Sequence, residues 1–139
     1  MPLGGNVVER EIFIAAGPAA VFEFFRDPAL MALWIGRGRV VEARPGGQLR
    51  IEISAGNVAR GRYTVLDPPR RIAFTWGWET QNFSQAELPP EASLVEFELE
   101  PRDGGTLVRL RHSGLPDGML DVHREHWGRY LAQLRSAAT

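Results

Sequence analysis

The sequence contains no cysteine and no lysine. Without cysteine the chain cannot form disulfides, thiolate nucleophiles, or zinc and iron–sulfur centres with thiolate ligands. Without lysine, Schiff-base chemistry and a P-loop phosphate site are excluded as well, because both need the lysine amine. All 16 basic residues are therefore arginines, and the 17 acidic residues leave a net charge of −1. This balance gives no electrostatic reason to expect nucleic acid as a partner.

Long apolar runs are also missing. No stretch approaches the roughly 18 apolar residues that a membrane span requires. The first residues lack the basic segment, apolar run and small-residue cleavage site of a signal peptide. We therefore expect a cytoplasmic protein with no membrane span. Residues 1–139 are expected to form one domain, which at this length buries roughly two-thirds of its unfolded surface.

The most informative stretch is an alternating aromatic segment that follows a double proline. Pro68 and Pro69 cannot continue a strand ladder, so they mark a sharp turn. After the turn, one face of the predicted strand carries four large apolar side chains: Ile72, Phe74, Trp76 and Trp78. Such a wall forms either packed core or the lining of a pocket, and its indole N–H groups still need hydrogen-bond partners.

Hydrophobic periodicity predicts a mainly antiparallel β protein with short helices near its start. The expected strands cover residues 7–14, 40–43, 49–53, 58–66, 71–78, 93–100 and 106–112. Two short helices are expected after the first strand, beginning at Pro18 and Asp27. The second should run to about Trp34 and bury Leu33. Residues 80–92 are expected to form a long polar loop that is mobile or ordered by a partner subunit.

The last predicted element is a long amphipathic helix over about residues 116–136. Its apolar stripe consists of residues at three- and four-residue steps: Leu120, His123, Trp127, Leu131, Leu134 and Ala138. An antiparallel sheet with one apolar face needs a cover, and this helix is the only predicted element large enough. A twisted sheet that curls around one helix is expected to leave a cavity between the two layers, and ligands bind in such places.

Short motifs spread over nearly the entire chain support this arrangement. They are Pro18 with Val21-Phe22, Asp27-Pro28 with Trp34, Pro45-Gly46-Gly47, Gly61, Asp67-Pro68-Pro69, Phe74-Thr75-Trp76 with Trp78, Gly105-Thr106, His112-Ser113-Gly114-Leu115, and His123 with Trp127. In this order and spacing the chain resembles the START-like helix-grip superfamily, also called SRPBCC or birch-pollen-allergen-like. Within it, the chain is most similar to the activator-of-heat-shock-protein-ATPase-like branch. One departure is His126-Trp127, where the family helix usually carries Gly-Trp, so a larger polar group lies near the helix edge.

The resemblance implies an α+β helix-grip fold. In this fold one curved antiparallel sheet of six or seven strands wraps around a long C-terminal helix, with two short helices after the first strand. The resemblance implies no single function, because its members look like ligand carriers, co-chaperone domains of the stress response, antibiotic-sequestering proteins and a few enzymes. Function must therefore be argued from individual residues.

Seven side chains are expected to converge on the cavity and are our candidate ligand-binding residues: Trp34, Phe74, Trp76, Trp78, His112, His123 and Trp127. Strand alternation directs Trp76 and His112 inward, and the helical period directs His123 and Trp127 to meet them. His126 lies off the helix stripe, so a three-histidine metal site is not expected. We assign no metal and no cofactor.

No catalytic residue is assigned. Glu79 would be a general base if it were buried near a histidine, but its position at a strand end beside a polar loop favours a solvated carboxylate. The sequence has no Gly-x-Ser-x-Gly nucleophile elbow. Arg60 and Arg62 share one strand face and would suit an acidic ligand, although an exposed strand face explains them equally well.

The leading hypothesis is non-catalytic binding of a hydrophobic or aromatic small molecule in the cavity between sheet and helix. One alternative is a protein-interaction module, such as a chaperone cofactor, that acts through its outer face or the 80–92 loop. Another is a small enzyme of the cyclase or hydrolase type that uses His112, His123 or Glu79. A homodimer formed through the loop edge is a further prediction about partners.

Overall fold

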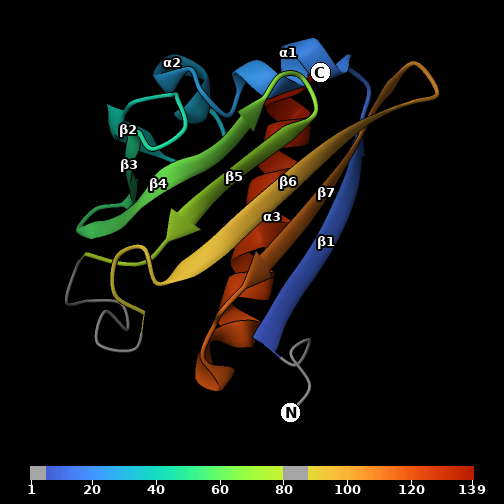
Figure 1. Ribbon diagram of the computed structural model, residues 1–139. Coiled ribbons are helices and arrows are strands. Elements are labelled where there is room, and N and C mark those ends of the chain that lie inside the picture. The colour runs from blue at the N-terminus through green and yellow to red at the C-terminus, as the bar shows by residue number, and fades with distance from the viewer. Residues whose placement is uncertain (1–5, 80–87) are drawn as a thin grey trace.

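The computed structural model describes residues 6–79 and 88–139, which form one curved antiparallel sheet wrapped around a C-terminal helix (Figure 1). The strands are β1 (Val7–Ile14), β2 (Arg37–Val41), β3 (Gln48–Ser54), β4 (Asn57–Asp67), β5 (Arg71–Trp76), β6 (Ser93–Arg102) and β7 (Gly105–Ser113). The helices are α1 (Pro18–Glu23), α2 (Pro28–Met31) and α3 (Leu120–Ala138), and a 3-10 turn, η2 (Asp117–Met119), precedes α3. This architecture confirms the fold class predicted from the sequence.

The strand order is β1-β7-β6-β5-β4-β3-β2, and neighbouring strands are antiparallel. From β1 the chain passes through α1 and α2 to the far edge of the sheet and then returns strand by strand (Figure 1). The last strand, β7, pairs with β1 along its whole length, from Val7 opposite Ser113 to Ile14 opposite Thr106. This long pairing joins the first and last strands into one continuous wall beside α3.

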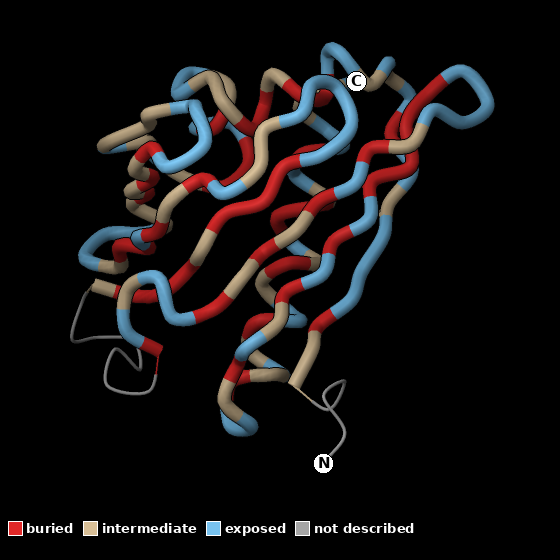
Figure 2. The backbone as a smooth tube through the Cα atoms, viewed as in Figure 1, coloured by how far each residue is buried: buried red, intermediate tan, exposed pale blue. Residues whose placement is uncertain are grey.

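Helix α3 lies across the concave face of the sheet and buries one stripe against it (Figure 1). The buried residues of the helix are His123, Trp127, Tyr130, Leu131 and Leu134. Figure 2 shows the matching alternation of buried and exposed residues along β6 and β7. The helix begins at Leu120 rather than at about residue 116, because the turn η2 comes first. None of the helices in the described part of the chain is long and apolar enough to cross a membrane.

The second short helix is shorter than predicted and leaves Leu33 exposed. Asp27 caps α2 as expected, its side chain accepting a backbone N–H (2.9 Å), but the helix ends at Met31 and the chain continues in tight turns. Beyond that point the helical period no longer decides which residues are buried. Leu33 is 58% exposed, whereas Trp34 turns inward and donates its Nε1–H to the Phe24 carbonyl (2.8 Å). The predicted burial of Leu33 is therefore wrong.

Most of the predicted 80–92 loop lies outside the described residues, and its mobility stays a prediction. Where the description resumes, Leu88 is buried, and its carbonyl accepts the backbone N–H of Trp78 (2.9 Å). Trp78 itself follows β5 and pairs with Ala59 of β4 through an isolated bridge. These bonds hold the Trp78 backbone beside the sheet.

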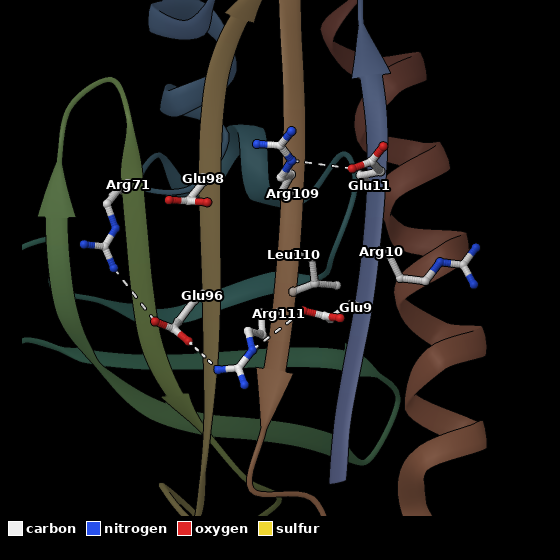
Figure 3. Close-up of a pocket in the computed structure, with 9 residues that line it drawn as sticks. All are labelled: Glu9, Arg10, Glu11, Arg71, Glu96, Glu98, Arg109, Leu110 and Arg111. Carbon is white, nitrogen blue, oxygen red and sulfur yellow. Dashed lines mark ion pairs between the residues drawn. The ribbon is translucent and has the colours of Figure 1, made fainter. Parts of the chain in front are cut away.

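The outer face of the sheet carries rows of ion pairs between neighbouring strands (Figure 3). In one row, Arg71 of β5, Glu96 of β6, Arg111 of β7 and Glu9 of β1 are joined by N–O distances of 3.7 or 3.8 Å. Exposed pairs of this kind stabilise a fold by only about 0–1 kcal/mol each. A shallow hollow of about 550 Å³ lies over this face, lined by equal numbers of acidic and basic residues. We interpret it as a solvated surface.

Candidate functional site

The seven candidate residues come together in one buried aromatic cluster between the sheet and α3. Each of them is at most 3% exposed. The Trp76 ring contacts those of Trp78 (5.5 Å between centroids) and of Trp127 on α3 (5.4 Å). The imidazoles of His112 and His123 lie edge to face at 5.3 Å. The two remaining candidates join the cluster through contacts with a shared neighbour, Phe97: they are Phe74 and Trp34.

His112 links the helix to the sheet through a chain of hydrogen bonds. Trp127 donates its Nε1–H to Nδ1 of His112 (2.9 Å). Because Nδ1 accepts, the neutral ring carries its proton on Nε2, which donates to the Ser93 Oγ (2.8 Å). The Ser93 hydroxyl in turn donates to the backbone oxygen of Trp76 (2.8 Å). Both imidazole nitrogens are therefore bonded within the protein.

His123 forms the same kind of pair with a second tryptophan. Trp78 donates its Nε1–H to Nε2 of His123 (3.3 Å), so the His123 proton lies on Nδ1 and is donated to the Met119 carbonyl (2.9 Å). Burial lowers the pKa of His112 well below its usual value and also lowers the pKa of His123. At neutral pH both rings are uncharged hydrogen-bonding groups of the core.

The cluster is packed rather than hollow. A small void at its edge, between Phe74, Trp34 and neighbouring apolar side chains, measures about 10 Å³. Such a volume has room for about one water molecule. The cavity predicted between the seven residues stays a prediction, and so does their part in ligand binding. One polar atom of the cluster, Nε1 of Trp76, is buried without a hydrogen-bond acceptor among the described residues.

The open space lies at the edge of this core, in a groove of about 500 Å³ that we call the α3 groove. Its walls come from the turns after α2, from the β3–β4 turn and from α3. Apolar side chains of four residues form much of the lining: Trp34, Ile35, Ile53 and Trp78. Two of the seven candidates, Trp34 and Trp78, are therefore shared between the closed core and the open groove.

The polar groups of the α3 groove lie mostly on the helix. They belong to His126, Arg129, Tyr130 and Gln133. Burial lowers the pKa of His126, and the charge of Arg129 lowers it further. Burial raises the pKa of Tyr130, so its phenol stays protonated and retains a donor. The lining of the groove is therefore mixed, and small-molecule sites also combine apolar side chains with polar groups that orient the ligand.

The chain matches the family described as "Activator of Hsp90 ATPase homolog 1-like protein" over residues 15–139. This match begins directly after β1 and includes strands β2 to β7 and the whole of α3. The chain belongs to this AHSA1-like family. A comparison with curated proteins finds no match.

Solved structures share the fold of this AHSA1-like chain along nearly its whole length. An AHSA1-like protein from Rhizobium etli is 39% identical, with a TM-score of 0.72 over 95% of this chain and 81% of that one. The Aha1 dimer from Colwellia psychrerythraea is 19% identical, with a TM-score of 0.76 over 95% of each chain. DynU16, from the dynemicin biosynthetic locus, is 20% identical with a TM-score of 0.79. The match to DynU16 includes 94% of this chain but only 46% of that protein.

Several groove residues of this AHSA1-like chain are absent from the candidates chosen on sequence. Arg129 and Gln133 lie on the exposed side of α3, and Ile53 is half-buried near the end of β3. Hydrophobic periodicity predicts which side chains are buried. It therefore indicates residues of the packed core and gives no sign of the half-exposed residues that line the groove. Three residues singled out in the sequence do line the groove: the candidates Trp34 and Trp78, and His126, which departs from the Gly-Trp pair of the family helix.

Glu79 is half-buried and held by arginines. Arg50 donates to both of its carboxylate oxygens (2.6–3.0 Å), and Arg60 lies 3.8 Å away. The hydrogen bonds from Arg50 lower the pKa of Glu79, which favours the ionised form but makes it a weak base. The expectation of a solvated carboxylate is corrected accordingly. Arg62 pairs with Glu91 (3.4 Å). No group of three histidine, aspartate or glutamate residues in the described part of the chain is arranged to hold a metal.

Proposed function

We propose that this AHSA1-like chain binds a small molecule with a hydrophobic or aromatic body in the α3 groove. The observation that carries the proposal is the groove itself, which joins two tryptophan rings, two isoleucines and a buried tyrosine around about 500 Å³. That volume lies within the range of roughly 300–1,000 Å³ that small-molecule sites occupy. The other hollow with a large open volume on the sheet is lined by ion pairs, which favour water over an apolar ligand.

The seven residues selected on sequence have two roles in this proposal. Trp34 and Trp78 line the groove and, being at most 3% exposed, present only a small part of their surface to the ligand. The others support these rings from behind: Phe74, Trp76, His112, His123 and Trp127. The hydrogen bond from Trp78 to His123 and that from Trp34 to the Phe24 carbonyl fix the two indoles before the ligand arrives. Such preorganisation lowers the entropic cost of binding.

Binding of the neutral dye N-phenyl-1-naphthylamine tests this proposal, since its fluorescence rises in apolar surroundings. Ala32→Trp adds a large ring at an exposed groove position without removing any core side chain. We expect this variant to weaken dye binding at least tenfold. Ala20→Trp is the matched control, because Ala20 is also exposed but lies on α1, away from the groove. Equal affinity in the two variants, or no binding to the wild type, would contradict the proposal.

A second candidate function is a protein-interaction module, and a specific surface favours it. Leu33, which is 58% exposed, lies in a shallow hollow of about 490 Å³ with Ala132 and Ala137 of α3. The family name suggests a chaperone of the Hsp90 type as partner, and the solved Aha1 dimer suggests a second copy of the chain. Light scattering of the wild type and of Leu33→Asp tests the dimer. Chaperone ATPase assays with the same two proteins test the other partner.

A further inference from the structure

Arg129 differs from most arginines of this chain because no carboxylate of the described residues forms an ion pair with it. Most of the 16 arginines form ion pairs, for example those on the outer face of the sheet and those around Glu79. Within residues 6–79 and 88–139, no aspartate or glutamate pairs with Arg129, and none lines the α3 groove. Among the described residues, the lining of the groove therefore contains a cation and no carboxylate, and the acidic side chain of Glu125 acts on the groove residue His126 from one turn before Arg129.

The position of Arg129 is as informative as its charge. It lines both the α3 groove and the shallower hollow beside Leu33, so it lies where the two meet. Gln133, one turn later on the same helix face, also lines both hollows. The lining of the groove also contains apolar side chains and Tyr130, which is next to Arg129 in sequence. A ligand that fills the groove would thus meet both apolar side chains and a guanidinium.

We infer that the ligand of the α3 groove is an amphipathic anion, whose carboxylate or similar oxyanion is bound by Arg129 and whose apolar part contacts the apolar side chains of the lining. This inference rests on the proposed function and adds the chemical class of the ligand. A guanidinium binds an oxyanion through two parallel N–H···O bonds, which a neutral ligand cannot match. The amide of Gln133 and the hydroxyl of Tyr130 supply further donors along the same wall.

Two dyes with the same ring system separate this inference from the proposed function. N-phenyl-1-naphthylamine is neutral, and 8-anilinonaphthalene-1-sulfonate carries one sulfonate on the same rings. Arg129→Gln keeps a side chain of similar stem and removes the charge. We expect it to weaken binding of the sulfonate dye about tenfold or more and binding of the neutral dye less than about twofold. Arg135→Gln is the matched control, since Arg135 is also an exposed arginine of α3 with no ion pair to another described residue, but it lines neither hollow.

The outcomes of these experiments distinguish failure of the proposed small-molecule binding from failure of the inferred selectivity for anions. If Ala32→Trp blocks the neutral dye while Arg129→Gln leaves the sulfonate dye unchanged, the groove binds small molecules but does not select anions, and the inference is overturned. If neither dye responds to Ala32→Trp, the proposed function fails first. Equal losses in Arg129→Gln and Arg135→Gln would also overturn the inference, because they would indicate a diffuse charge effect. Raising the salt concentration should weaken binding of the sulfonate dye relative to the neutral dye in the wild type, but not in Arg129→Gln.

Discussion

At the scale of single residues, the two buried histidines show how this core holds polar groups without charge. Each imidazole accepts a hydrogen bond from a tryptophan and donates its one proton to an oxygen, that of Ser93 for His112 and that of Met119 for His123. A second proton would place a charge in the core. It would also turn the accepting nitrogen into a donor that faces an indole N–H. The neutral tautomers are therefore part of the packing.

Stability should consequently fall as the pH drops below about 6.5. The native pKa values of His112 and His123 are lowered by burial, so between those values and the unfolded value of about 6.5 the unfolded chain binds more protons. The free energy of unfolding then decreases as the pH falls, by at most about 1.4 kcal/mol per pH unit for each histidine. Urea unfolding between about pH 7.5 and pH 5 measures this dependence.

His123→Gln provides the control for the pH dependence. Glutamine retains an acceptor for the Trp78 N–H but takes up no proton, so the variant should show a shallower pH dependence whatever its absolute stability. Carboxylates act in a lower window: arginine hydrogen bonds lower the pKa values of three glutamates, Glu52, Glu79 and Glu100. The stability that they contribute is lost only as the pH falls below about 4.5. The same slope in wild type and variant would contradict the assignment to His123.

At the scale of elements, two glycines differ in what surrounds them: a flexible side chain lies next to one, and the backbone of a paired strand lies next to the other. Gly128 is in the middle of α3, where an added Cβ would meet the end of the Arg10 side chain, with Nη2 at 2.6 Å. Arg10 extends from β1 towards the helix (Figure 3). At Gly61 in β4, an added Cβ would lie 1.7 Å from the backbone oxygen of Thr75 on β5. The end of a flexible side chain can move aside, whereas a paired strand cannot.

Gly128→Ala is therefore expected to raise the free energy of unfolding by up to about 1 kcal/mol, because alanine favours the helix. Gly61→Ala is expected to lower it by at least about 2 kcal/mol, since β4 and β5 would have to separate. Chemical unfolding of the two variants beside the wild type tests both signs at once. If Gly128→Ala were as destabilising as Gly61→Ala, the Arg10 side chain would be fixed against the helix rather than free to shift.

The lengths of the elements decide how well the sequence predicts them. Strand β1 was predicted at its observed bounds, and the apolar stripe of α3 was identified because it repeats over five turns. Helix α2 has only four residues, which is too short for a helical period to show which side is buried. The predicted burial of Leu33 is wrong for this reason. Strand β2 begins earlier than predicted, at Arg37, because an edge strand with polar residues gives little apolar alternation.

At the scale of the whole molecule, the sequence predicts which residues are buried but not where space remains. Strand alternation and the helical period predict that Trp76, His112 and Trp127 face the interior, because burial on one face repeats along a strand or helix. The open volume depends on how rings from different elements fit together, and that has no period. The α3 groove lies where the turns after α2 and β3 leave part of the helix uncovered. Those turns and the exposed side of α3 carry no sequence pattern that marks a cavity.

Because the α3 groove exists only when α2, the β3–β4 turn and α3 are assembled, a ligand bound there should stabilise the entire fold. N-phenyl-1-naphthylamine at about ten times its Kd should add about 1.4 kcal/mol to the free energy of unfolding. For a chain of this size that raises the melting temperature by roughly 5 °C.

Tryptophan fluorescence should change with the same concentration dependence, since Trp34 and Trp78 line the groove. Thermal unfolding with and without dye should show the rise in Ala20→Trp and lose it in Ala32→Trp. A dye that bound the wild type without raising its melting temperature would have to bind the unfolded chain equally well, which the groove cannot explain.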